Sequence, residues 1–303
     1  MMRWIDHLPV VPIALPLLTA AAMLLLSEHR RRTKFALSMA STLGLLACAI
    51  ALLRMSDGRA GTWTADVGVY LAANWPTPFG IALAVDRLTA MMLLLTAILG
   101  LASLMFSHAR WDRAGVHFHP LFQCLLMGLN GAFLTADLFN LFVFFEVMLA
   151  ASYGLVLHGS GMARVRAGLH YIAINLVASS LFLIGVSLIY AASGTLNMAD
   201  LAETLPVLVP GDRRLLEAGA AILGVAFLIK SAMWPLTFWL PAPYAAASPP
   251  VAAVFSVMTK VGIYAILRLW MLLFADGAGE STGFGREWLL AGGMLTLAFG
   301  AVG

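Results

Sequence analysis

The sequence predicts an all-α, polytopic integral membrane protein of about nine transmembrane helices, and three observations support this class. Hydrophobic residues make up 61% of the 303 residues and charged residues only 11%, against roughly 25% charged in a typical soluble domain. Apolar runs recur along the chain at close to the ~20 residues that cross a ~30 Å hydrocarbon core. Basic residues gather between the runs. We therefore expect a membrane protein and not a soluble enzyme.

Nine apolar runs can be marked along the chain. They cover residues 9–26, 35–53, 88–106, 120–136, 138–157, 167–191, 218–245, 251–274 and 288–303. Because a basic cluster follows the first run instead of preceding it, we interpret this run as a permanent helix and not as a signal peptide. The sixth run is long enough to cross at a tilt. The last run is short for a span, so we expect the chain to be a fragment of a longer protein.

The basic residues predict an orientation in the membrane. Clusters follow the first, third and fifth runs: Arg30, Arg31, Arg32 and Lys34, then Arg110 and Arg113, then Arg164 and Arg166. Loops rich in lysine and arginine remain in the cytoplasm. We therefore expect these loops on the cytoplasmic side and the N-terminus outside, although Arg213 and Arg214 in an outer loop count against this orientation.

Lysine is rare in this chain and unusually placed. Among 18 basic residues only Lys34, Lys230 and Lys260 are lysines, and the last two lie well inside apolar runs. Arginine remains charged at any biological pH, whereas a buried lysine can lose its proton. The pattern places lysine where a titratable group is useful, which is typical of proton transfer.

One carboxylate, Glu146, also lies deep inside a run. A charge at the centre of a membrane helix costs ~2.5–3.5 kcal/mol, so Glu146, Lys230 and Lys260 together cost roughly 8–10 kcal/mol before any pairing. An ion pair that only holds two helices together is one explanation. It leaves the second lysine unexplained, so we favour a proton relay. Arg268, near the end of its run, is expected to extend outward to the headgroups.

A proline follows one of these lysines closely. Pro235 cannot donate a hydrogen bond to the carbonyl of Ser231, so the helix must kink or unwind just after Lys230. Backbone groups freed inside a bilayer are tolerated only where protein or water satisfies them. Broken helices near the midplane recur in transporters, where helix ends help to hold ions. A simple packing kink is the alternative.

Other polar residues inside the runs are weaker signals. Asn175, Ser179 and Ser180 are interpreted as interhelical hydrogen-bond partners. Asp137 precedes the fifth run, where an acidic residue suits the helix dipole. Aromatic residues of that run are interpreted as lipid-facing or packing surface: Phe142, Phe144 and Phe145.

Several function classes are disfavoured. The chain has no nucleotide-binding glycine pattern, no cysteine–histidine metal cluster and no spacing typical of a catalytic triad, so we expect neither a cofactor nor a metal. Cys48 and Cys124 each lie inside an apolar run and are interpreted as small packing residues. The net charge of +3 is small and confined to loop clusters, so a nucleic-acid partner is not expected.

Four stretches of this sequence resemble the proton-translocating antiporter-like family. They are FNLFVFFEVMLAASYGL (139–155), GTLNMADLA (194–202), FLIKSAMWPLTFWLP (227–241) and TKVGIYAILR (259–268). The family covers the Mrp-type multisubunit sodium/proton antiporters and the membrane subunits of respiratory complex I. The D subunits of the Mrp complexes are the most similar branch.

The resemblance implies a role for each buried charge. Glu146 matches a glutamate of the fifth helix that pairs with a lysine on a broken seventh helix, here Lys230, beside Pro235. Lys260 matches a titratable residue of the eighth helix that passes the proton toward the protein centre. The family fold consists of inverted five-helix repeats. The resemblance then implies three N-terminal helices (1–107), a first repeat (118–274) and the start of a ninth helix (288–303).

The implied function is that of a secondary transporter subunit and not of an enzyme. It moves protons in exchange for sodium or another monovalent cation, together with other membrane subunits of a hetero-oligomeric complex, as a multi-pass protein of a bacterial inner membrane. The alternative is a proton-pumping membrane subunit of an NADH:quinone oxidoreductase or a hydrogenase-type respiratory complex. A structural subunit without transport is a third possibility, disfavoured by the buried lysines.

Overall fold

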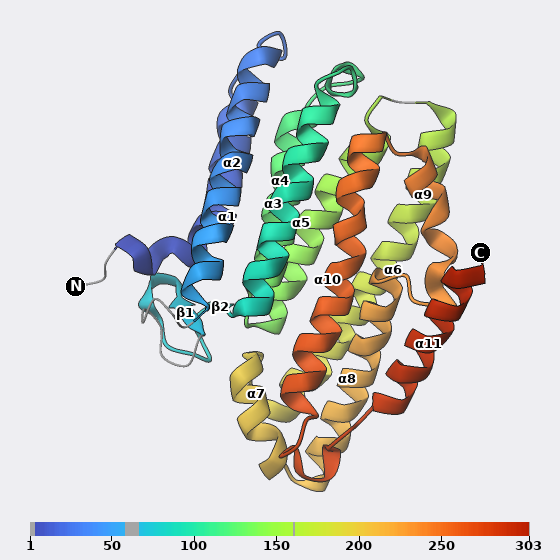
Figure 1. Ribbon diagram of the computed structural model, residues 1–303. Coiled ribbons are helices and arrows are strands. Elements are labelled where there is room, and N and C mark those ends of the chain that lie inside the picture. The colour runs from blue at the N-terminus through green and yellow to red at the C-terminus, as the bar shows by residue number, and fades with distance from the viewer. Residues whose placement is uncertain (1–3, 58–66, 160, 303) are drawn as a thin grey trace.

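The computed structural model describes residues 4–57, 67–159 and 161–302 and is mostly helical (Figure 1). The α-helices of this part are α1 (Val11–Leu24), α2 (Arg31–Met55), α3 (Arg87–Ser107), α4 (Phe118–Leu134), α5 (Leu138–Leu157), α6 (Met162–Ser193), α7 (Met198–Thr204), α8 (Pro210–Lys230), α9 (Pro241–Ala246), α10 (Pro249–Leu273) and α11 (Arg286–Val302). A short 3-10 helix, η1 (Trp4–Val10), leads into α1. Strands β1 (Gly68–Leu71) and β2 (Ala82–Val85) pair antiparallel between α2 and α3.

Six helices of the described residues are long and apolar enough to cross a membrane. They are Asp6–Leu24, Arg31–Met55, Arg87–Ser107, Leu138–Leu157, Met162–Ser193 and Pro249–Leu273. The shorter α4 is also apolar. The chain is thus a polytopic helical membrane protein, but the predicted count of about nine is not reached on length and composition. The seventh predicted run is divided after Lys230, and α11 has only 17 residues.

The long helices lie side by side, and the chain reverses direction between them (Figure 1). α6 and α8 approach especially closely because each contributes a glycine to the contact. A Cβ atom added to Gly185 would lie 2.8 Å from the carbonyl oxygen of Gly219. Small residues that let helix backbones meet are a common basis for helix association in membranes.

The two ends of the bundle differ in composition. The turn after α1, the loop after α3 and the turn after α5 lie at one end, and the β1–β2 hairpin and α7 lie at the other (Figure 1). We call the first the arginine-rich end, because it carries the three basic clusters that predict the cytoplasmic side. We call the other the hairpin end. Arg213 and Arg214, which count against this orientation, lie there near the start of α8. Arg213 forms an ion pair with Glu280.

Arg268 does not extend outward as predicted. Its guanidinium forms an ion pair with Asp86, which precedes α3, and donates a hydrogen bond of 2.8 Å to the Thr89 hydroxyl. Burial alone would raise the pKa of Asp86, but the Thr89 N–H and the charge of Arg268 together hold that pKa below its ordinary value. The prediction was wrong because the partner is distant in sequence. Arg268 ties α10 to the start of α3.

Acidic side chains also close helix ends at the hairpin end. Asp137 accepts a hydrogen bond of 2.7 Å from the backbone N–H of Asn140 and so caps α5. Such a cap satisfies one of the free N–H groups at a helix start. Burial of the carboxyl group raises the pKa of Asp137. The bridge that Asp137 forms with Asn197 joins this cap to the start of α7.

Candidate functional site

Glu146 and Lys230 come together inside the bundle, and a serine lies between them. The Ser179 hydroxyl on α6 donates a hydrogen bond to Glu146 Oε1 on α5. Lys230 Nζ, at the end of α8, donates to the same hydroxyl oxygen at 3.2 Å. Among the described residues no ion pair within 4.0 Å joins Glu146 to Lys230 directly. A single hydroxyl group therefore connects the two side chains by hydrogen bonds.

The surroundings of Lys230 are largely apolar. Its residue surface is only 5% exposed, and its Nζ lies 4.9 Å from the centre of the Phe145 ring. An ammonium over an aromatic face is attracted by the ring quadrupole. Phe145 is thus a contact of the lysine and not a lipid-facing residue. Glu146 is only half-buried, so the carboxylate end of the pair lies nearer the edge of the bundle.

The helix stops at the lysine. α8 ends at Lys230, and the chain resumes as the short 3-10 helix η6 (Leu236–Trp239) and then α9. Pro235 cannot donate to a preceding carbonyl, so continuous helix is disfavoured there. Between the two segments Ala232 has a φ of 53°, a left-handed conformation that a non-glycine residue rarely adopts.

Neighbouring groups form a hydrogen bond and a close packing contact at this break. The indole N–H of Trp239 donates to the carbonyl oxygen of Ile229 at 2.9 Å, one residue before Lys230. α10 packs directly against the break at Gly262, where an added Cβ would lie 2.9 Å from the backbone nitrogen of Ser231. The part of the break next to Lys230 is therefore covered by protein, as non-helical backbone inside a membrane requires, whereas Trp234 and Pro235 are exposed.

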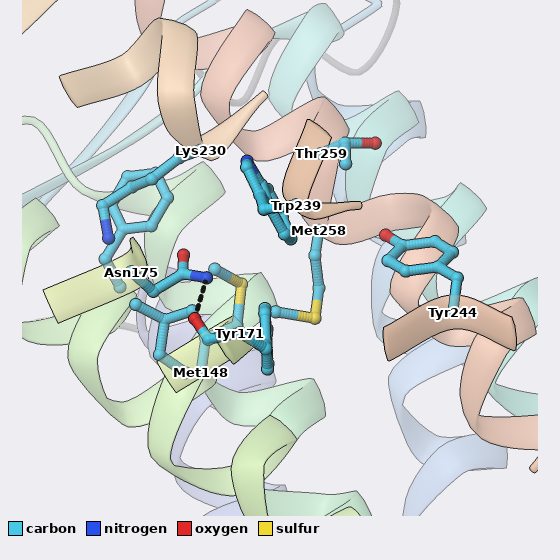
Figure 2. A pocket seen from close by; sticks show the side chains of 10 residues that line it. Met148, Tyr171, Asn175, Lys230, Trp239, Tyr244, Met258 and Thr259 are labelled. Carbon is cyan, nitrogen blue, oxygen red and sulfur yellow. Dashed lines mark hydrogen bonds between the residues drawn. The ribbon is translucent and has the colours of Figure 1, made fainter. Parts of the chain in front are cut away.

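A small cavity lies beside Lys230, and Figure 2 shows the side chains around it. Its lining comes from α5, α6, the broken segment and α10: Phe145, Met148, Leu149, Tyr171, Asn175, Lys230, Trp239, Tyr244, Met258 and Thr259. Its volume of about 10 Å³ is comparable with the ~10–15 Å³ that one water centre needs. Asn175 on its wall donates to the Tyr171 carbonyl at 3.0 Å (Figure 2). The cavity connects the surroundings of Lys230 with Thr259.

Lys260 does not lie with the other two charges. It lies near the middle of α10, as the sequence indicates, but its side chain is exposed, and its Nζ donates to the Thr259 hydroxyl at 3.3 Å. The exposed stripe of α10 continues through Ile263, Leu267 and Met271. Among the described residues no element covers this face of α10, and position along a helix does not determine which face a residue occupies.

Sequence reasoning misses the role of Ser179. It identifies this residue only as an interhelical hydrogen-bond partner, whereas in the structure the serine is the group between the two charges. A hydroxyl in an apolar run beside two charged helices is the available signal. The neighbouring Ser180 gives the same signal, yet it is exposed and donates only to the Leu176 carbonyl of its own helix.

Comparisons with known proteins place this chain in a family. The family model described as "NADH:quinone oxidoreductase/Mrp antiporter, TM" matches residues 135–303. A probable K⁺/H⁺ antiporter D subunit from Rhizobium meliloti is 61% identical over the whole chain, and a Na⁺/H⁺ antiporter D subunit from Alkalihalophilus pseudofirmus is 38% identical over 98% of it. The chain spans 56% and 58% of these two relatives, so it covers about half their length.

A solved structure agrees with the sequence relatives. A chain of the Mrp complex from Dietzia sp. superposes with a TM-score of 0.80 at 36% identity, over 90% of this chain and 50% of that one. The chain therefore belongs to the NADH:quinone oxidoreductase/Mrp antiporter transmembrane family, and antiporter D subunits are among its relatives.

Proposed function

We propose that this chain is part of a D-type subunit of a cation/proton antiporter complex in a bacterial cell membrane. Protons move through Glu146, Ser179 and Lys230 in exchange for sodium or another monovalent cation. The other subunits of the complex are its partners. Because the R. meliloti relative is described as part of a probable K⁺/H⁺ antiporter, potassium is the first cation to test.

The shared hydroxyl of Ser179 supports this proposal most strongly. A serine hydroxyl has one proton to donate and lone pairs that accept. If Lys230 gives a proton to the hydroxyl while the hydroxyl gives its own to Glu146, the serine keeps its proton count. The lysine and the carboxyl group both become neutral. Neutral forms are favoured where water is scarce, so the transfer has a small energetic cost in this site.

Lys260 is the next station of the proposed relay. The cavity beside Lys230 is lined by Thr259, whose hydroxyl accepts a hydrogen bond from Lys260. A water molecule in the cavity would supply a proton carrier between the two lysines. Lys260 would then pass the proton on toward the protein centre, as the resemblance implies.

The domain organisation proposed with this function follows the helices. α1–α3 form an N-terminal part (1–107), and α4, α5, α6, the broken α8–α9 segment and α10 form one five-helix repeat (118–274). Residues 288–303 begin a ninth helix. With the broken segment counted as one crossing, and with α4 and α11 counted as spans, the total is nine.

Two substitutions test the relay in the assembled complex. Lys230→Arg keeps a positive charge but removes a proton that can be released, and Glu146→Gln removes the proton acceptor. Both are expected to abolish cation-dependent proton movement in everted membrane vesicles, while complex assembly measured by co-purification is retained. A matched control is Lys34→Arg, because Lys34 pairs with Glu28 outside the relay. Wild-type transport by Lys230→Arg would overturn the proposal.

A respiratory subunit is the second candidate, because the matching family model covers both kinds of complex. In that case electron transfer in other subunits drives the same relay. Vesicles without an electron donor separate the two. An antiporter subunit exchanges cations for protons under an imposed pH gradient alone, whereas a proton-pumping subunit moves protons only when an electron donor is added.

A further inference from the structure

A second group of titratable side chains lies at the arginine-rich end, away from the relay. Its centre is Asp112 in the 3-10 helix η4 (Trp111–Arg113) and His119 in the first turn of α4. Both are buried, with 7% and 4% of their surface exposed. His119 Nε2 lies 3.6 Å from Asp112 Oδ2, and His108 Nδ1 lies 3.6 Å from the same oxygen. Two imidazoles thus share one carboxylate oxygen.

The hydrogen-bonding groups of this pair are unused. Asp112 Oδ1 and both ring nitrogens of His119 are buried and have no hydrogen-bond partner among the described residues. A buried polar group without a partner is costly, and native structures rarely keep one without a reason. The small cavity beside the pair has room for about one water molecule. The unpartnered atoms and the cavity together provide hydrogen-bonding groups and room for a small ligand.

The charged groups around Asp112 and His119 indicate what this pair can bind. Titratable and charged groups face it from each neighbouring segment: Glu28, Arg31 and Lys34 from α2 and the turn before it, His108 from the end of α3, Arg113 from η4, His117 from the loop before α4, and His158 from the end of α5.

Most of these charges are already matched elsewhere. Lys34 Nζ lies 2.6 Å from Glu28, and His117 Nδ1 lies 3.0 Å from the same carboxylate. Arg113 is 63% exposed and approaches Asp112 only to 3.9 Å. In the described part of the chain, the basic groups that approach the Asp112 carboxylate lie 3.6–3.9 Å away, beyond hydrogen-bond distance. A proton on His119 would provide a charged donor, because an imidazolium donates from both nitrogens while neutral imidazole donates from one.

We infer that Asp112 and His119 form a proton-binding site at the arginine-rich end, separate from the Glu146–Lys230 relay. Uptake of one proton turns this carboxylate and imidazole, whose buried atoms have no hydrogen-bond partner among the described residues, into a buried ion pair. The rings of Phe35 and Phe118 lie edge-on to His119 and shield it. Because the site holds its proton between α3 and α4, it responds to the pH of the compartment that this end faces.

Infrared difference spectroscopy of the purified complex with isotopically labelled histidine tests this site directly. A pH titration between about 3 and 8 is recorded for wild type and for three variants, because burial moves the titration of a histidine below its ordinary range. His119→Gln should lose one titrating histidine signal. Asp112→Asn should keep that signal and move it to lower pH, because the anion that favours imidazolium is removed. His29→Gln changes an exposed histidine at the same end and should leave the His119 signal in place.

Two results would overturn the inference. One is a His119→Gln spectrum with the same titrating signals as wild type, and the other is an Asp112→Asn titration that coincides with wild type. If His119→Gln prevents assembly, the Asp112→Asn measurement still decides. The readout is spectroscopic and does not depend on transport. A failure of this inference can therefore be told apart from a failure of the proposed relay.

Discussion

At the scale of single residues, one hydroxyl group defines the site. Charge and depth in the sequence single out Glu146 and Lys230, and the structure brings them to opposite sides of Ser179. A direct ion pair would stabilise both charged forms and hold the proton on the lysine. In the proposed relay, a hydroxyl between them weakens that pairing and provides a route for the proton. The serine is therefore expected to matter for transport more than for folding.

Ser179→Ala is expected to lower proton-coupled transport by about tenfold or more, because positioned proton transfer commonly contributes ~10²–10⁴ in rate. Ser179→Thr keeps a hydroxyl and should restore most of the activity. The control is Ser180→Ala on the next residue, whose exposed hydroxyl donates only within its helix. Transport is measured in everted vesicles at matched protein levels. Equal activity of the two alanine variants would remove Ser179 from the relay.

Lys260 and Arg268 show what the sequence could not predict at this scale. Helical depth can be counted from the sequence, but the face that a residue occupies depends on the packing of the whole bundle. Lys260 lies at mid-helix yet is exposed. Arg268 has its partner at Asp86, 182 residues earlier, and no local pattern connects them. Single-sequence reasoning identifies costly charges and cannot pair them across the fold.

At the scale of elements, the broken helix is the feature that the sequence describes best. A proline five residues after a lysine inside an apolar run predicts an interruption, and α8 ends at Lys230. The predicted start of the run is less accurate, because α8 begins at Pro210 and includes a charged first turn. Contacts beyond the helix stabilise its first half. Ser281 Oγ donates to Glu217 at 2.7 Å, and Arg213 pairs with Glu280.

The contact between α6 and α8 provides a test at this scale, because it positions Ser179 opposite Lys230. A Cβ atom added to Gly219 would lie 2.9 Å from the carbonyl oxygen of Gly185. Gly219→Ala must therefore separate the helices, and overpacking of this kind destabilises by about 1–3 kcal/mol. A lower melting temperature of the purified complex is expected, with a parallel loss of transport.

The matched control for this substitution lies in the same helix. Gly211 is in the first turn of α8, and an added Cβ there meets no atom of the described residues within 4 Å. Gly211→Ala should leave the melting temperature unchanged or raise it slightly, since alanine favours helix. If both variants melt at the same temperature, the close approach of the two glycines does not limit the stability of the bundle.

At the scale of the whole molecule, the sequence predicts the class and the order of the helices well, and the connections poorly. Length and apolarity are sufficient to find membrane helices, so each predicted run corresponds to helix. The β1–β2 hairpin and α7 lie in segments that the sequence presents only as loops, because they are too short to show a periodic pattern. Long-range contacts form them: Ala136 donates its backbone N–H to Ala82 at 3.0 Å, and Met198 donates to Ala136 at 2.9 Å.

The orientation of the whole bundle in the membrane remains a prediction, and cysteine labelling tests it. The basic clusters at one end place that end in the cytoplasm, and the ion pair of Arg213 with Glu280 neutralises a basic residue at the other end. His29→Cys, exposed at the arginine-rich end, should react with an impermeant maleimide only in everted vesicles. Asp276→Cys, exposed in the loop after α10, should react only in right-side-out vesicles.

The wild-type protein is the blank for this labelling, because Cys48 is buried and Cys124 lies half-buried within the apolar helix α4. Labelling of the two variants in the reverse vesicles would contradict the positive-inside assignment. It would also place the Asp112–His119 pair outside the cell, where it would respond to external pH. With the predicted labelling, the pair lies at the cytoplasmic end of the bundle, the end at which an antiporter driven by external protons releases them.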